Sequence, residues 1–135
     1  MSRKSKNEKQ VIKRLGELAE QRKQILSISP DQALDRILDA PQPTALVHSF
    51  PEEDFYYLVQ DIGPEDSLPI LTLASDRQWE YLMDREIWVK DKIDLPAVTR
   101  WLGLMLQADS VRTIKWYIEQ KRDYAEYYLF KKFHL

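Results

Sequence analysis

The sequence predicts an all-α fold, namely a compact superhelix or solenoid-like bundle of short helices with longer helices at both ends. Two observations lead to this prediction. Short units that begin with Pro or Ser recur at intervals of ten to thirteen residues between residues 30 and 86. The segments before and after them carry apolar residues three and four apart, the spacing of amphipathic helices. Helices of about two turns are unstable alone in water, so the short units must stack on one another.

The composition indicates one soluble folding unit, which we place at residues 8–135. Hydrophobic residues make up 44% and charged residues 31% of the 135 residues, a balance typical of globular chains. The chain has no cysteine, which excludes disulfides and thiolate zinc sites and fits a reducing cytoplasm. It also has neither a signal peptide nor an apolar stretch of membrane-spanning length, so we expect a cytoplasmic protein without membrane insertion.

The N-terminal segment divides into a basic arm and a long helix. Residues 1–7 have no apolar side chain after the initiator, so we expect a disordered arm. Residues 8–28 predict a helix, because apolar residues recur along one face. The stripe is formed by Val11, Leu15, Leu18 and Ile25.

The short units of residues 29–86 share one pattern, most regular in those that begin at Pro51 and Ser75. An acid stands second, where it complements the positive end of a helix, and large apolar residues stand fifth and eighth, one turn apart. Units begin at Pro30, Pro51, Pro64 and Ser75, and a looser copy begins at Pro41. In the four regular units the fifth residues are Leu34, Phe55, Leu68 and Trp79, and the eighth residues are Ile37, Leu58, Leu71 and Leu82. Pro69 predicts a kink or a late helix start in its unit.

The remainder of the chain predicts a connection followed by two helices over residues 94–135. The connection runs from Ile87 to Ile93, and we interpret it as irregular rather than as a strand. Asp94 is the expected cap of the first helix, and Ser110 or Asp109 that of the second, which should run towards Phe133. The abrupt end suggests that the chain is the N-terminal fragment of a larger protein.

No arrangement of residues predicts catalysis. His48 and His134 are far apart and lack the spacing of a metal site. Three glycines cannot form a phosphate-binding loop, and no serine has a nucleophile-elbow context. We therefore expect a protein that is not an enzyme, with no cofactor and no small-molecule substrate.

The acidic middle of the chain is the best candidate for a divalent-cation surface. Residues 37–75 hold seven acids and no Lys or Arg. The candidate ligands are Glu52, Glu53, Asp54, Glu65 and Asp66. Capping of helix N-termini explains most of these acids equally well and is the interpretation we favour. The same surface could also dock a basic partner or the chain's own basic arm.

The last helix mixes basic and aromatic residues, which favours an interaction surface. We expect one face in the core, formed by Ile114, Tyr117, Ile118, Ala125 and Tyr128. A second face then presents Trp116, Tyr127 and Phe130 for contact with a protein partner or a second copy. Stacking on single-stranded nucleic acid is the weaker interpretation, because the net charge of −2 is far from that of a nucleic-acid-binding domain.

The units from Pro51 to Met83 resemble the N-terminal superhelical domain of E-type magnesium transporters and the short helices of flagellar motor-switch G proteins. The transporter resemblance implies a magnesium-responsive acidic surface, although the other transporter domains are absent. More closely, the unit from Pro51 and the segments Ile37–Pro41, Asp61–Asp66 and Leu73–Ser75 are similar to an uncharacterised bacterial family of unknown function. Our leading hypothesis is a non-enzymatic scaffold that associates with itself or a protein partner through its first and last helices, with a cation-responsive domain as the alternative.

Overall fold

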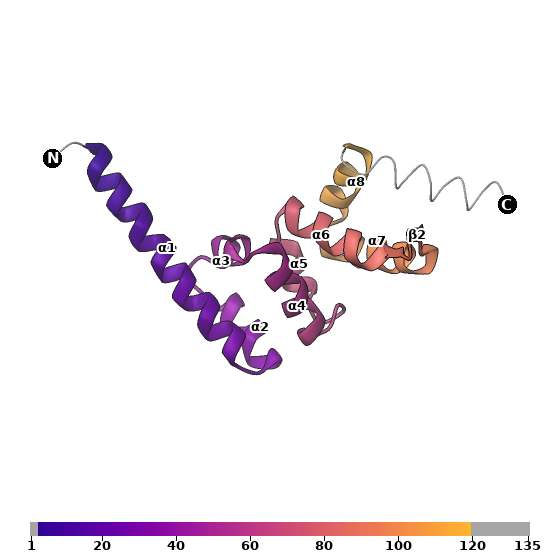
Figure 1. Cartoon of the computed structure of the whole chain (residues 1–135), viewed down its shortest axis with the longest axis horizontal. Coiled ribbons are helices and arrows are strands. Elements are labelled where there is room, and N and C mark those ends of the chain that lie inside the picture. Colours follow the sequence, from indigo (N-terminus) through magenta and orange to yellow (C-terminus); the bar gives the residue numbers. More distant parts are fainter. Residues whose placement is uncertain (1–2, 120–135) are drawn as a thin grey trace.

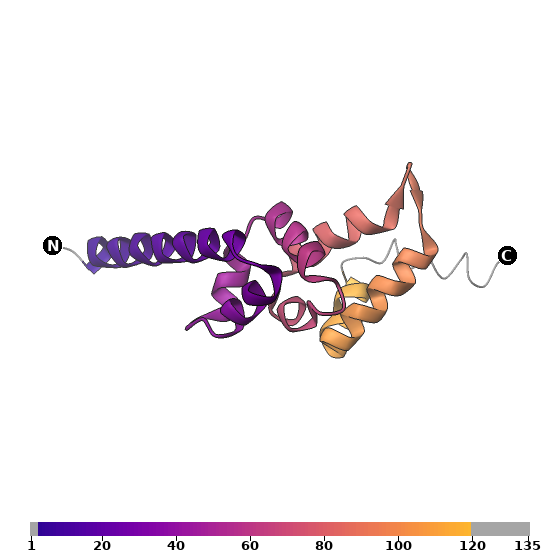
Figure 2. The same cartoon turned by 90° about the horizontal axis from the view of Figure 1, so that it is seen from below.

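The computed structural model describes residues 3–119, which form eight helices and one small β-hairpin (Figures 1 and 2). The prediction of an all-α fold is confirmed. The elements are α1 (Arg3–Ser27), α2 (Pro30–Leu38), α3 (Pro43–Ser49), α4 (Glu52–Ile62), α5 (Leu68–Leu73), α6 (Asp76–Ile87), β1 (Trp88–Val89), β2 (Lys92–Ile93), α7 (Leu95–Ala108) and α8 (Ser110–Glu119). Among these residues, no helix combines the length and the apolarity that crossing a bilayer requires.

Helix α1 is longer than the sequence predicts. It begins at Arg3, so the expectation of disorder up to residue 7 is wrong for the part of that arm that the structure describes. The segment is rich in Lys, and straight-chain residues favour helix even without apolar partners. Only the C-terminal half of α1 packs on the body, through buried Ile25 and partly buried Leu18, against α2 and α3. The N-terminal half projects from the molecule (Figures 1 and 2).

The short helices bury most of the positions that the sequence pattern marks as apolar, and only Leu34 and Leu68 are partly exposed. All four residues at the eighth position are buried: Ile37, Leu58, Leu71 and Leu82. Ser75 forms a capping box with Gln78 at the start of α6, whereas the looser unit begins its helix at Pro43 instead of Pro41. The late start that Pro69 predicts is confirmed, because a turn precedes Leu68 and α5 begins there.

The segment from Ile87 to Ile93 is a short antiparallel hairpin, so its interpretation as an irregular connection is wrong. Trp88 pairs with Ile93 and Val89 with Lys92. The two residues between the strands, Lys90 and Asp91, have φ angles of 50° and 66°, the left-handed backbone of a tight two-residue turn. This turn lacks the usual Asn-Gly or Asp-Gly pair, so the sequence carried no clear signal for it.

One continuous core joins the helices from the second half of α1 to α8. Its largest fully buried side chains are those of Trp79 on α6, Trp101 on α7 and Phe55 on α4. Asp94 caps α7 as predicted, by accepting a hydrogen bond from the amide of Ala97 at 3.4 Å, and Asp109 caps α8. The arrangement leaves α1 and α8 at opposite ends of the molecule (Figure 1).

Candidate interaction surfaces

The face of α8 that the sequence predicts to be exposed packs against the core instead. Trp116 is only 3% exposed and packs edge-to-face on Trp79, with ring centroids 6.0 Å apart. Ile114 and Ile118, expected in the core, are 54% and 63% exposed. Both predictions are therefore wrong. Of the other residues predicted for these two faces, Tyr117 is partly buried, and Ala125, Tyr127, Tyr128 and Phe130 lie outside the described residues.

The exposed face of α8 borders an apolar groove shared with α7. The groove has a volume of about 570 Å³ and is lined mainly by Leu102 and Leu106 of α7 and by Ile114, Tyr117 and Ile118 of α8. Val111, one turn before Ile114, is also largely exposed. Apolar residues at positions 111, 114 and 118 form a stripe along one side of a helix. A stripe of this kind is typical of a helix that packs against another protein surface.

The N-terminal half of α1 presents a second exposed apolar stripe. Val11, Ile12 and Leu15 are 56%, 68% and 58% exposed. They lie on the same face of α1 as Leu18 and Ile25, which pack on the body further towards the C-terminal end of the helix. We call the segment Arg3–Leu15 the α1 projection. It holds six basic residues and one acid in the sequence, so it is a basic amphipathic helix.

Helices α4 and α6 pack side by side and form an acidic surface that contains tyrosines. Together the two helices carry eight acids and two bases. The guanidinium of Arg85 lies 4.6 Å from the ring centroid of Tyr56, 5.8 Å from that of Tyr57 and 5.7 Å from that of Tyr81. This cation holds the three rings together. We call this surface the α4/α6 face. It consists of Tyr56, Tyr57 and Tyr81 and of the exposed acids of the two helices, which are Glu53, Asp61, Asp76 and Glu80.

Tyr56 anchors this cluster through its hydroxyl, which donates a hydrogen bond to Glu86 at 2.8 Å. Gln60 donates a second hydrogen bond to the same carboxylate oxygen. Partial burial and the hydrogen bond to Glu86 raise the pKa of Tyr56 to about 12. The hydroxyl therefore stays protonated when an ordinary tyrosine has ionised.

The raised pKa of Tyr56 predicts a loss of stability in alkali. The folded form holds the proton more tightly than the unfolded chain, so this contribution is complete below pH 10 and disappears as the pH rises towards 12. We expect Tyr56→Phe to flatten that part of the stability curve, as measured by urea denaturation between pH 9 and 12. Tyr57→Phe is the matched control, and an equal effect of both variants would contradict the prediction.

The five predicted metal ligands are not brought together. Residues 3–119 contain no group of three or more His, Cys, Asp or Glu side chains that could hold a metal ion. Glu52, Glu53 and Asp54 occupy the first turn of α4, in agreement with the capping interpretation. Glu65 instead pairs with Arg100 at 3.0 Å, and a backbone hydrogen bond of its own, followed by this ion pair, lowers its pKa.

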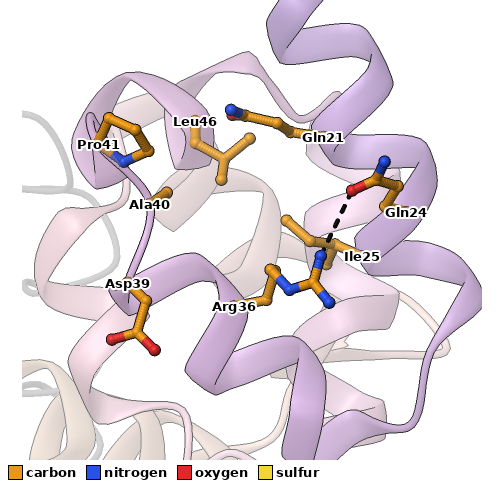
Figure 3. A pocket seen from close by; sticks show the side chains of 8 residues that line it. All are labelled: Gln21, Gln24, Ile25, Arg36, Asp39, Ala40, Pro41 and Leu46. Carbon is orange, nitrogen blue, oxygen red and sulfur yellow. Dashed lines mark hydrogen bonds between the residues drawn. The ribbon is translucent and has the colours of Figure 1, made fainter.

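A smaller hollow lies where α1 meets α2 and α3 (Figure 3). Its volume is about 220 Å³, and Arg36 donates a 3.4 Å hydrogen bond to Gln24 across one side of it. Ile25 and Leu46 form part of the wall, and both belong to the core. The hollow is below the size of typical ligand pockets, so we interpret it as part of the joint that holds α1 to the body.

The structure therefore defines an all-helical domain that, within residues 3–119, has exposed apolar residues on α1 and on α7 and α8. The chain belongs to the family of unknown function DUF6178, which it matches over residues 9–135. This match confirms the predicted similarity to an uncharacterised family. No curated protein and no solved structure matches the chain significantly, so the resemblance to magnesium transporters and motor-switch proteins finds no support.

Proposed function

We propose that this domain is a non-enzymatic, cytoplasmic scaffold that associates with itself or with a protein partner through its first and last helices. In this proposal the successive short helices act as a superhelical core that holds the two end helices apart. The observation that carries the proposal is the outward apolar stripe on α8, next to the groove with α7. Ile114 and Ile118 are each more than half exposed although Thr113 and Trp116 of the same helix are buried.

Burial of this stripe would release water from apolar area, which is the main favourable term in most protein association. The groove beside it offers room for side chains of a partner helix. Charge does not oppose such contact, because α8 within Ser110–Glu119 carries two bases and one acid. The stripe on the α1 projection offers a second surface of the same kind at the other end.

The double substitution Ile114→Ser/Ile118→Ser tests this proposal. Both side chains are exposed, so the variant should keep the wild-type melting temperature, while its association constant should fall at least tenfold. Light scattering after size exclusion at increasing concentration measures self-association, and retention of a partner in pull-down measures the alternative. Val89→Ser, at an exposed apolar position in the hairpin, is the control. A wild-type chain that stays monomeric and retains no partner would contradict the proposal.

A further inference from the structure

We propose that the α1 projection of one copy docks on the α4/α6 face of a second copy. This inference rests on the proposed scaffold function and names the partner of its first helix. The projection offers an apolar stripe of Val11, Ile12 and Leu15 with basic residues around it. The partner must therefore supply an apolar or aromatic surface surrounded by carboxylates.

The α4/α6 face has these two properties. On α4, Glu53, Tyr57 and Asp61 follow one another at intervals of four residues, and all three are exposed. Tyr57 is 48% exposed although its ring lies close to Tyr56 and Arg85. This ring can contact the apolar stripe of the projection, while the acids on either side of it face the basic residues.

Charge is the argument that selects this surface. The projection has a net charge of +5, and helices α4 and α6 together have a net charge of −6. Two projections would repel each other, and the groove of α7 and α8 has no excess of acids around it. Opposite potentials on two surfaces accelerate their encounter and fix their orientation.

The contact has to form between copies rather than within one chain. Helix α1 is one unbroken helix of 25 residues, about 37 Å long at 1.5 Å per residue. Its C-terminal half packs on α2 and α3, which directs the N-terminal end away from α4 and α6 (Figures 1 and 2). Two copies that exchange their projections would each fill one α4/α6 face, and such a dimer is closed.

Sedimentation velocity of the full chain with paired charge reversals tests the inference. We expect self-association at 50 mM NaCl that weakens at least tenfold at 500 mM, because ion pairing between exposed surfaces is screened. Lys9→Glu/Lys13→Glu on the projection and Glu53→Lys/Asp61→Lys on α4 should each reduce association at least tenfold. An equal mixture of the two variants should associate again, since the reversed projection of one then meets the reversed face of the other.

The control Lys90→Glu/Lys92→Glu changes the net charge by the same amount in the hairpin and should associate as the wild type does. Association that survives salt and both reversals, but is lost in Ile114→Ser/Ile118→Ser, would overturn the inference and leave the proposed function intact. A monomer that sediments with phosphatidylglycerol vesicles would assign the projection to an anionic lipid surface and overturn it too. Circular dichroism verifies that each variant remains helical.

Discussion

Trp79→Ala is expected to lower the free energy of unfolding by about 3–5 kcal/mol, the usual cost of removing a buried aromatic side chain. Trp79 is fully buried at the place where α6 meets α5 and α8. Its Nε1 donates a hydrogen bond to the carbonyl of Leu71 at 2.8 Å, and the guanidinium of Arg112 lies 3.9 Å from its ring centroid. Urea denaturation followed by circular dichroism measures the change.

A pair of milder substitutions separates the hydrogen bond of Trp79 from its packing. Trp79→Phe removes an N–H that has a partner, whereas the Nε1 of Trp116 is buried without a hydrogen-bond partner among the described residues. An unpaired buried donor is itself unfavourable, so its removal offsets part of the lost packing. We expect Trp116→Phe to cost about 1 kcal/mol less than Trp79→Phe. Equal costs would show that the two indole N–H groups are in equivalent surroundings.

The features that the sequence predicted correctly depend on local chemistry. The units from Pro51 and Ser75 place Phe55, Leu58, Trp79 and Leu82 in the core as the spacing predicts. Spacing along a helix determines which residues share a face, and capping residues determine where the helix begins. The neighbouring helices are not needed to reach either conclusion.

The sequence could not predict which face of α8 packs on the core, because the helix has apolar residues on two faces. Ile114 and Ile118 occupy one face, and Trp116 with Thr113 the other. Periodicity shows that two faces exist but does not show which one meets the core. The choice depends on tertiary contacts, here the indole of Trp79 and the cap at Asp109, whose carbonyl accepts a hydrogen bond from the Thr113 hydroxyl at 2.7 Å.

The α4/α6 face was predictable only in part. The acidic excess of residues 37–75 was evident, and docking of a basic segment on it was one of the expected possibilities. The tyrosine cluster was not, because Tyr56 and Arg85 come from different helices and meet only when α4 packs on α6. The sequence pattern of acids at helix starts suggested metal ligands, but Glu52, Glu53 and Asp54 share the first turn of α4 while Glu65 pairs with Arg100.

Gln78→Leu is the second substitution with a large expected effect, a loss of about 2–4 kcal/mol, because buried carbonyl groups lose their hydrogen-bond donor. Gln78 is 2% exposed, and its Nε2 donates to the carbonyls of Val47 at 2.7 Å and Phe50 at 3.1 Å. Its Oε1 accepts from the amide of Ser75 at 2.8 Å, which completes the cap of α6. One side chain thus ties the start of α6 to the end of α3.

Gln78→Glu distinguishes the lost hydrogen bonds from a simple loss of side-chain volume. The carboxylate has nearly the same shape, but it would face two carbonyl oxygens, which raises its pKa in the folded state. The stability of this variant should therefore improve as the pH falls from 7 to 5, where the carboxyl group takes up a proton and can donate again. Gln32→Leu, at an exposed position of α2, is the control and should change stability by less than about 0.5 kcal/mol. A Gln78→Leu variant as stable as this control would show that the two carbonyls find other donors.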